Sequence, residues 1–241
     1  MKKLQIDFSK LPQEAPEYDL TELLEAGCHF GHKKEKWNPK MDEFIYMEKN
    51  GVHIFDLAKT ASQLKNAYNY LYWLGKNGKS VVIVGTKRQA KDIVEATAKD
   101  AGMYYIASRW LGGLLTNWNQ VRKSISRMNE LEDGLKNKKF VGYTKYEQVQ
   151  FEKELARLSR FFEGIRKLES KPDAIIVIDP VREKNAIKEA KDTEVTVLAL
   201  ADSNADPDQV DILVPANDDA VKSIQYIVSQ FAAGYKAGKN A

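Results

Sequence analysis

Short apolar segments alternate with amphipathic segments along most of this chain. Five of the apolar segments have the length and the Val and Ile content of buried strands, and they span 79–86, 103–108, 173–179, 194–200 and 211–215. The helix-forming segments that alternate with them include 87–102, 182–192 and 217–235. Because parallel strands are joined by crossover connections that are usually helical, this alternation predicts an α/β fold in which helices cover both faces of one parallel sheet.

Two further elements are expected before the first parallel strand. Residues 44–56 have the pattern of a β-hairpin that turns at Asn50 and Gly51. Residues 57–74 have the apolar periodicity of an amphipathic helix. After the strand, Thr86 is expected to cap the next helix, which should end at Gly102.

The strand and helix alternation stops between residues 109 and 171, where heptad spacing replaces it. Apolar side chains recur three or four residues apart at 118, 121, 125, 128, 131 and 135, and again at 151, 155, 158, 162 and 165. This spacing predicts two antiparallel helices, at about 115–132 and 145–170, that form a coiled-coil hairpin. Because a two-helix hairpin has a thin core, we expect it to project from the sheet domain as an insertion.

These patterns divide the chain into an N-terminal extension at 1–18, a sheet domain at 19–108 and 172–235, an inserted hairpin at 109–171 and a C-terminal tail at 236–241. The sheet meets the hairpin at "RWLGGLLTNW" (109–118), where Gly112 and Gly113 permit a sharp turn or a close approach to a partner. The two tryptophans can pin the base of the hairpin. Arg109, Trp110 and Asn117 are candidates for contacts with RNA.

The positive charge of the chain is concentrated rather than spread evenly. The formal net charge is +3, but residues 104–171 contain 14 Lys and Arg against 8 Asp and Glu. Two long windows, 57–91 and 101–129, contain no acidic residue at all. A solvated helix face explains one run of lysines, but two acid-free windows favour a polyanionic partner. The charge distribution therefore indicates nucleic acid.

Three basic segments are the candidate contacts with a phosphate backbone. The segment "AGCHFGHKKEKWNPKM" (26–41) places an aromatic ring among lysines, which suits a phosphate backbone and a stacked base. The start of the helix at 87 and the acid-free helix after 118 add further cations. The candidates in these segments are Lys33, Lys34, Lys36, Trp37, Lys40, Lys87, Arg88, Arg122, Lys123 and Arg127.

Several other classes of protein find little support in the sequence. "VVIVGTKRQAK" has one glycine where a dinucleotide fingerprint needs three, and no Walker spacing, nucleophile elbow or paired-cysteine metal motif is present. A single cysteine and the lack of a membrane-length apolar run suggest a cytoplasmic protein that does not contact membranes. A phosphate- or nucleotide-binding enzyme and a coiled-coil adaptor stay open as alternatives to an RNA-binding protein.

Five motifs in order resemble the bacterial small-subunit ribosomal protein S2 family. They are "LLEAGCHFGHKKEKWNPKM", "NGVHIFDLAKT", "VVIVGTKRQAK", "RWLGGLLTNW" and "VPANDDAVKSI", and the resemblance runs from about Leu20 to about Tyr235. It implies a flavodoxin-like or Rossmann-like sheet domain with a protruding coiled-coil hairpin. It also implies a structural role in translation without catalysis. The implied partners are small-subunit ribosomal RNA and other small-subunit proteins, including the messenger-binding protein S1.

The resemblance further implies a metal ion, which some family members hold with a histidine and several aspartates. The corresponding residues here are His32, Asp202, Asp218 and Asp219. The three aspartates follow predicted strands and should meet at the carboxyl edge of the sheet. One imidazole with several carboxylates suits zinc better than magnesium, although no cofactor is required by the expected role. The alternative is that Asn217 or Asp218 only caps the following helix.

Overall fold

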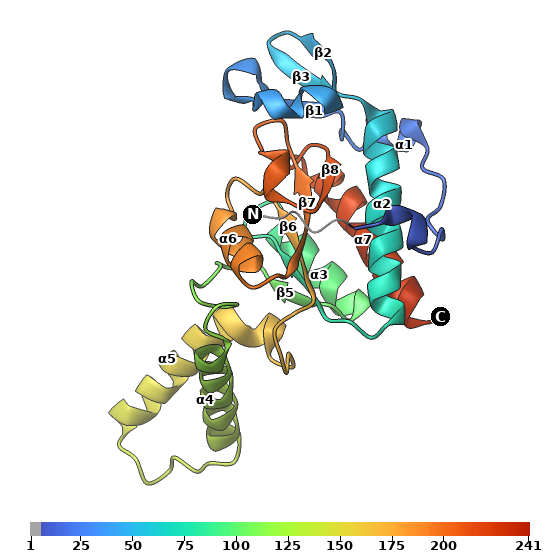
Figure 1. Cartoon of the computed structure of the whole chain (residues 1–241). Coiled ribbons are helices and arrows are strands. Elements are labelled where there is room, and N and C mark those ends of the chain that lie inside the picture. Colours follow the sequence, from blue (N-terminus) through green and yellow to red (C-terminus); the bar gives the residue numbers. More distant parts are fainter. Residues whose placement is uncertain (1–5) are drawn as a thin grey trace.

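A five-stranded parallel sheet forms the centre of the computed structural model, which describes residues 6–241 (Figure 1). The strand order is β5-β4-β6-β7-β8. The sheet therefore confirms the predicted α/β fold, since each predicted strand overlaps an observed one. The bounds are β4 (Val81–Val84), β5 (Tyr104–Ile106), β6 (Ala174–Ile178), β7 (Thr196–Ala201) and β8 (Ile212–Pro215).

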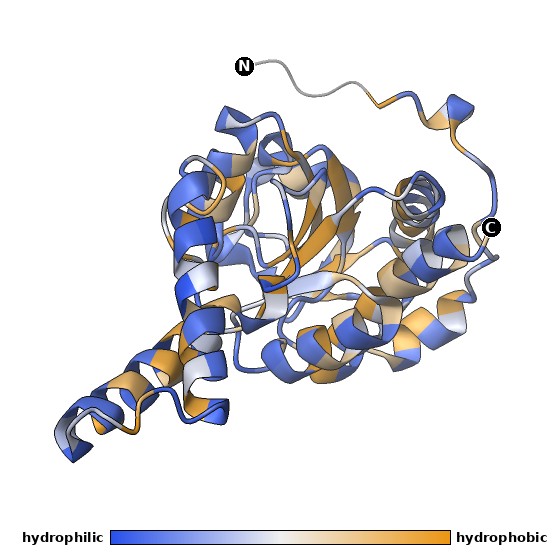
Figure 2. Ribbon diagram, turned by 90° about the horizontal axis from the view of Figure 1, so that it is seen from below, coloured by the Kyte–Doolittle hydropathy of each residue, from blue (hydrophilic) through white to orange (hydrophobic). Residues whose placement is uncertain are grey.

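Alternate residues of these strands enter two separate apolar cores, one on each face of the sheet. Ile83, Ile176 and Leu198 pack against α2 (Leu57–Lys76), α3 (Lys91–Ala101) and α7 (Val221–Lys239). On the other face, Val82 and Val177 pack against α6 (Lys184–Asp192) and the base of the hairpin. Both faces are covered, which explains why the strands are apolar throughout rather than alternating (Figure 2).

Helices α2 and α7 approach so closely that glycine is needed where they cross. A Cβ atom on Gly75 would collide with the backbone oxygen of Tyr235, and one on Gly238 would collide with that of Tyr72. Helix α7 continues to Lys239, and Lys236 forms an ion pair with Asp100 of α3 at 2.9 Å. The separate C-terminal tail expected at 236–241 is therefore wrong for residues 236–239, which are helical.

A small antiparallel sheet with order β1-β3-β2 lies at the carboxyl edge of the large sheet. Its strands are β1 (Phe30–Lys33), β2 (Ile45–Lys49) and β3 (Val52–Phe55). Asn50 and Gly51 both have positive φ, as a tight hairpin turn requires, so the predicted hairpin is confirmed. The short helix α1 (Leu20–Glu25) precedes β1.

The N-terminal extension follows the outer side of α2. The backbone N–H groups of Glu14 and Ala15 donate to Asn69 Oδ1 at 3.0 and 2.8 Å, and Glu17 forms an ion pair with Lys65. The extension expected at 1–18 is therefore attached to the domain from residue 6 onward. Its first five residues lie outside the described part of the chain.

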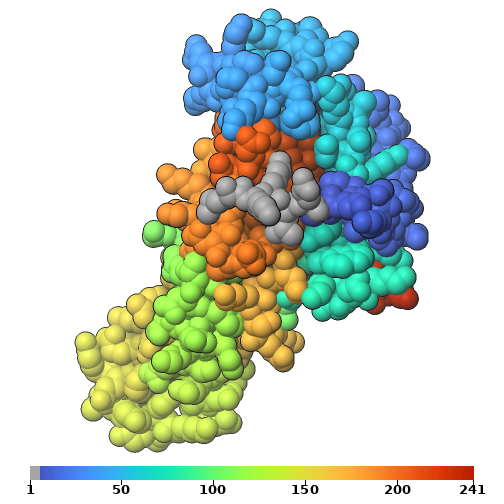
Figure 3. Space-filling view, viewed as in Figure 1, coloured from blue at the N-terminus to red at the C-terminus, as the bar shows by residue number. Residues whose placement is uncertain are grey.

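Two antiparallel helices, α4 (Trp118–Lys136) and α5 (Lys145–Phe162), project from the sheet domain (Figures 1 and 3). Helix α5 ends earlier than the expected residue 170, and a 3₁₀ turn follows at Glu163–Ile165. The turn places Gly164 so close to β5 that a Cβ atom there would collide with the backbone oxygen of Tyr105. The end of α5 is thus set by packing on the sheet, which heptad spacing does not reveal.

The two helices bury their apolar seam to different extents. On α4 the seam residues stay buried from Trp118 to Leu131. On α5 only Leu158 and Phe162, near the sheet domain, are buried, whereas the residues at 151 and 155 are partly buried. The α5 side of the seam therefore gains most of its stability near the sheet domain.

Candidate nucleic-acid interface and polar cluster

Four side chains suited to holding a cation meet at the carboxyl edge of the large sheet. His32 lies on β1, Asp202 follows β7, and Asp218 and Asp219 follow β8. One ligand atom from each residue lies within 4.8 Å of the others. His32 Nδ1 is 2.9 Å from Asp202 Oδ1, and His32 Nε2 is 3.7 Å from Asp219 Oδ2. The fold thus brings together the four residues that the resemblance implied as a set.

Lys87 lies against this acidic group rather than on the surface. Its ammonium nitrogen is 2.5 Å from Asp218 Oδ1, 2.8 Å from Asp219 Oδ1 and 2.9 Å from Asp179 Oδ2. Burial alone would lower the pKa of Lys87, but the Asp218 carboxylate and its neighbours outweigh burial and raise the pKa. Lys87 is only 9% exposed. The expectation that it contacts RNA is therefore wrong.

The cluster retains more negative than positive charge. Burial, together with the charges of Asp179 and Asp202, raises the pKa of Asp218 to about 7. Asp218 Oδ2 is buried and has no hydrogen-bond partner within the described residues. The hydrogen bond with Asp202 raises the pKa of His32, which favours its positive form. Asp179, Asp202, Asp218 and Asp219 face one lysine and one histidine, so the cluster has a deficit of positive charge that protons or a cation can supply.

Two nearby residues decide the question of helix capping. Asn217 Oδ1 accepts hydrogen bonds from the N–H groups of Asp219 and Ala220 at 2.9 and 3.0 Å, so Asn217 caps the turn before α7. The Asp218 carboxylate is therefore free to join the cluster.

The expected cap at Thr86 is not observed. Thr86 does not cap α3, because α3 begins only at Lys91, and the Thr86 hydroxyl instead donates to the carboxylate of Glu183.

The basic loop after β1 contains both paired and unpaired lysines. Lys34 forms an ion pair with Glu48 at 2.7 Å. Lys40 lies 3.1 Å from an oxygen of Asp206 and 2.6 Å from one of Asp208. These two lysines hold the loop against its neighbours. An RNA phosphate would have to displace an acidic partner to reach them.

The remaining candidates, at the end of β1 and in this loop, are more accessible. Lys33 and Lys36 are exposed, and neither forms an ion pair with any residue between 6 and 241. The Trp37 ring packs edge-on against His53, with 4.7 Å between ring centroids. This contact holds the partly exposed ring in place, next to Lys36 in the sequence.

The junction between sheet and hairpin is bound to α6 by one carboxylate. Glu189 Oε1 accepts hydrogen bonds from Trp110 Nε1 at 3.1 Å and from the Gly113 N–H at 2.8 Å. Glu189 Oε2 accepts from the N–H groups of Leu115 and Thr116 at 3.0 and 3.4 Å. The acidic residue missing from the junction's own sequence is therefore supplied from a distant helix.

This arrangement gives the candidate RNA contacts of the junction different roles. Trp110 is 6% exposed and donates to Glu189, so the expectation that it contacts RNA is wrong. Arg109 and Asn117 are exposed. The Asn117 side chain makes no capping hydrogen bond to α4, so it is available to a partner. Gly113 has a φ of +87°, which explains the glycine at this turn.

The outer face of α4 presents cations next to a polar groove. The groove has a volume of about 550 Å³, and its lining residues are Asn119, Arg122, Lys123, Ser126, Arg127 and Glu130. Arg127 donates to both carboxylate oxygens of Glu154, at 3.2 and 3.0 Å, and so ties α4 to α5. Arg122 and Lys123 are exposed and form no ion pair with the described residues.

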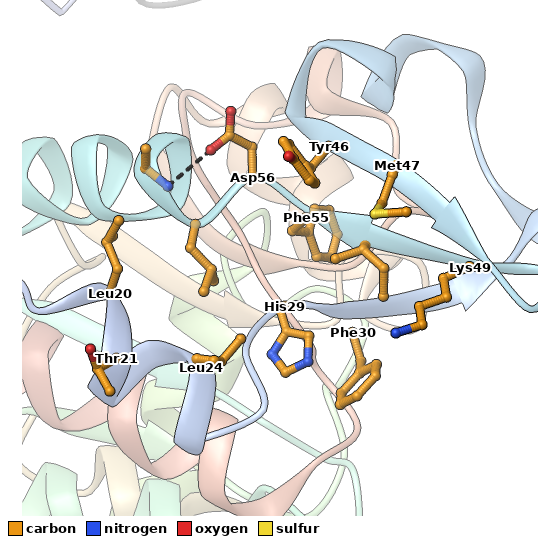
Figure 4. Close-up of a pocket in the computed structure, with 13 residues that line it drawn as sticks. Leu20, Thr21, Leu24, His29, Phe30, Tyr46, Met47, Lys49, Phe55 and Asp56 are labelled. Carbon is orange, nitrogen blue, oxygen red and sulfur yellow. Dashed lines mark hydrogen bonds between the residues drawn. The ribbon is translucent and has the colours of Figure 1, made fainter.

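A second hollow, of about 610 Å³, lies between α1, the small sheet and the start of α2 (Figure 4). Its lining is mostly apolar and includes the exposed side chains of Leu24, Phe30 and Tyr46. Asp56 accepts a hydrogen bond from the N–H of Ala58 as the cap of α2, so its carboxylate is already engaged. The hollow has the character of a hydrophobic contact surface rather than a catalytic cleft.

Comparison with known proteins assigns the chain to a family. The model of the family described as Ribosomal protein S2 matches residues 23–238. The chain belongs to the ribosomal protein S2 family. It is also 47% identical to the small ribosomal subunit protein uS2 of Deinococcus radiodurans over 208 residues, which are 86% of this chain and 79% of that protein.

This S2 family member differs from the sequence-based expectation mainly in its buried charges. The four proposed metal ligands lie together, whereas Lys87 and Trp110 serve internal contacts. Asp179 and Glu189 were missed, because each acts on residues distant in the sequence. The one available signal for Asp179 was its place at the end of the predicted strand 173–179. Among residues 6–241, no helix is long and apolar enough to cross a membrane.

Proposed function

We propose that this protein is a structural constituent of the small ribosomal subunit, where it binds ribosomal RNA and neighbouring proteins during translation. The family match over residues 23–238 is the observation that carries the proposal. The protein acts through its surfaces and carries out no catalysis. Its protein partners include S1 in organisms that have it.

RNA binding resides in the exposed cations that lack an internal partner. After Lys87 and Trp110 are removed from the candidates, the accessible group consists of Lys33, Lys36, Arg88, Arg109, Arg122 and Lys123, with Trp37 and Asn117 beside them. Each cation that meets a phosphate releases counterions into solution, so the affinity should fall steeply as salt is added. Lys34, Lys40 and Arg127 have a secondary role because each already binds a carboxylate.

The first prediction compares two sets of substitutions on α4. The double variant Arg122→Gln/Lys123→Gln should weaken binding to protein-free small-subunit RNA. The plot of the logarithm of the association constant against the logarithm of the salt concentration should become less steep by about 1.5. Arg127→Gln should leave the slope close to that of the original protein, because this guanidinium binds Glu154. Filter binding between about 50 and 200 mM salt measures both slopes. An unchanged slope in the double variant would rule out RNA contact through this face.

The enzyme alternative has its own test. A nucleotide that raises the Tm of the protein would favour a phosphate- or nucleotide-binding enzyme.

The polar cluster fits a bound zinc ion. It offers one imidazole and three carboxylates, it holds excess negative charge, and Asp218 Oδ2 has no described partner. An imidazole together with carboxylate oxygens suits zinc, whereas magnesium prefers oxygen ligands and water. We include zinc in the proposal, held by His32, Asp202, Asp218 and Asp219. Its role is to join β1 to the ends of β7 and β8 and so to stiffen this surface.

The second prediction concerns the metal content of small subunits. Subunits that contain Asp202→Ala/Asp219→Ala should carry about one zinc ion less per particle than the original, because two of the four ligands are lost. Asp206→Ala/Asp208→Ala is the matched control, since it removes two nearby aspartates that bind Lys40 instead. Element analysis of purified subunits measures the difference. Equal zinc content in all three samples, with each variant incorporated, would remove zinc from the proposal.

A further inference from the structure

The far end of the hairpin, residues 136–149, exposes apolar and aromatic side chains to solvent; we call it the hairpin tip. Tyr146 is 73% exposed, Val141 72%, Tyr143 48% and Val149 43%. The hairpin tip lies at the end of the hairpin that is remote from the sheet domain (Figure 3). Several exposed apolar side chains gathered in one short segment point to a partner.

The hairpin tip is held in one conformation by its own contacts. Gln148 Nε2 donates to the backbone oxygens of Phe140 and Tyr143 at 3.1 and 3.0 Å. Phe140 and Phe151 pack with 4.5 Å between ring centroids, and the Tyr143 ring meets Phe151 edge-on at 5.3 Å. The exposed rings are therefore carried on a scaffold that is ordered before any partner binds, which lowers the entropy lost on binding.

The charges of the hairpin tip select the class of partner. Lys138, Lys139 and Lys145 are exposed, and none forms an ion pair with the described residues. The one acidic residue of the tip, Glu147, accepts hydrogen bonds from the N–H and hydroxyl of Thr144 in a capping box. Exposed tyrosines among unpaired lysines match the chemistry of single-stranded nucleic acid, in which bases stack and phosphates repel carboxylates.

We propose that the hairpin tip binds unpaired bases of small-subunit ribosomal RNA by stacking on Tyr146, with Tyr143 beside it and the three lysines on the flanking phosphates. This proposal rests on the proposed RNA-binding role and adds a second mode to it. The α4 face binds only RNA phosphates, through its cations, whereas the hairpin tip also binds exposed bases.

The test measures binding of the full-length chain to protein-free small-subunit RNA. Tyr146→Ala should weaken binding by about tenfold, within the range of about 5- to 150-fold expected for one stacked base, and should leave the salt slope unchanged. Tyr146→Phe should bind like the original, because it keeps the stacking ring. Tyr46→Ala is the matched control, since Tyr46 is also 73% exposed but lies on β2.

A photoreactive residue at position 146 in assembled subunits identifies what the ring contacts. Crosslinks to unpaired bases support the proposal, whereas crosslinks to a ribosomal protein alone overturn it. Equal binding by Tyr146→Ala and the original would also overturn it. In that case the Arg122→Gln/Lys123→Gln variant would still test whether the protein binds ribosomal RNA through α4. If the original chain fails to bind this RNA, both proposals fail.

Discussion

Replacing Glu189 with alanine is expected to lower the free energy of unfolding by about 3 kcal/mol and to loosen the base of the hairpin. The substitution leaves the indole N–H of Trp110 and the N–H groups of Gly113 and Leu115 without their acceptor. A fully buried unpaired donor costs about 1 to 3 kcal/mol, and these three hydrogen bonds are partly buried, so the summed loss stays well below three times the upper value. Urea unfolding followed by tryptophan fluorescence measures the change. Asp192→Ala, at an exposed residue of the same helix, should change stability by less than about 0.5 kcal/mol.

The pH dependence of stability tests whether the charge of the Glu189 carboxylate, and not only its packing, stabilises the junction. Burial tends to raise the pKa of Glu189, but the hydrogen bonds from Trp110 and from backbone N–H groups outweigh burial and lower it. The stabilisation is therefore complete above the ordinary carboxyl value of 4.5 and is lost as the pH falls through the lower folded value. The difference in free energy of unfolding between the original protein and Glu189→Gln should become smaller at acidic pH. A difference that is constant across this range would contradict the role given to the carboxylate.

The second large effect is expected for Leu158→Asp, which should unfold the hairpin and leave the sheet domain folded. Leu158 is 9% exposed in the buried part of the seam, so its replacement buries an unpaired charge at a cost of about 3 to 5 kcal/mol. The sheet domain retains its own core around α2 and α7. Limited proteolysis should cut the variant within residues 118–162, and circular dichroism should show the loss of helix.

Ala156→Asp is the matched control for this substitution. It adds the same carboxylate to α5 two residues earlier, at an exposed position, and should leave the hairpin intact. The loss of hairpin stability in Leu155→Asp should lie between those of Leu158→Asp and Ala156→Asp, because the Leu155 side chain is only partly buried. A hairpin in Leu158→Asp that resists protease as well as the original would show that the seam does not depend on this residue.

Local patterns were sufficient to predict the sheet. The apolar strands, the turn at Asn50 and Gly51 and the end of α3 at Gly102 depend on neighbouring residues, and each is observed. Strand β1 was not predicted, because its partner strand β3 begins some 20 residues later and its own four residues carry little β pattern. The end of α5 was also missed, since it depends on a close approach between Gly164 and Tyr105.

The candidate site was predictable only where the fold or the resemblance placed residues together. Asp202 and Asp218 follow strands of one parallel sheet, so their meeting at its carboxyl edge could be expected. Lys87 looked like an RNA contact because its own window contains no acid, whereas its three aspartate partners lie 92 or more residues away in the sequence. Glu189 was missed for the same reason. Acid-free windows therefore locate basic segments but do not show which cations stay free.

Sucrose-gradient sedimentation of a cell extract, with a probe for this chain, is the most direct test of the central claim. We expect the chain to sediment with the small ribosomal subunit at low salt, and the Arg122→Gln/Lys123→Gln variant to dissociate at a lower salt concentration than the original. Digestion of the RNA before centrifugation should move the chain to the top of the gradient. A chain that stays at the top in untreated extract, or that keeps its position after nuclease, would contradict the claim that this protein is held in the small subunit by ribosomal RNA.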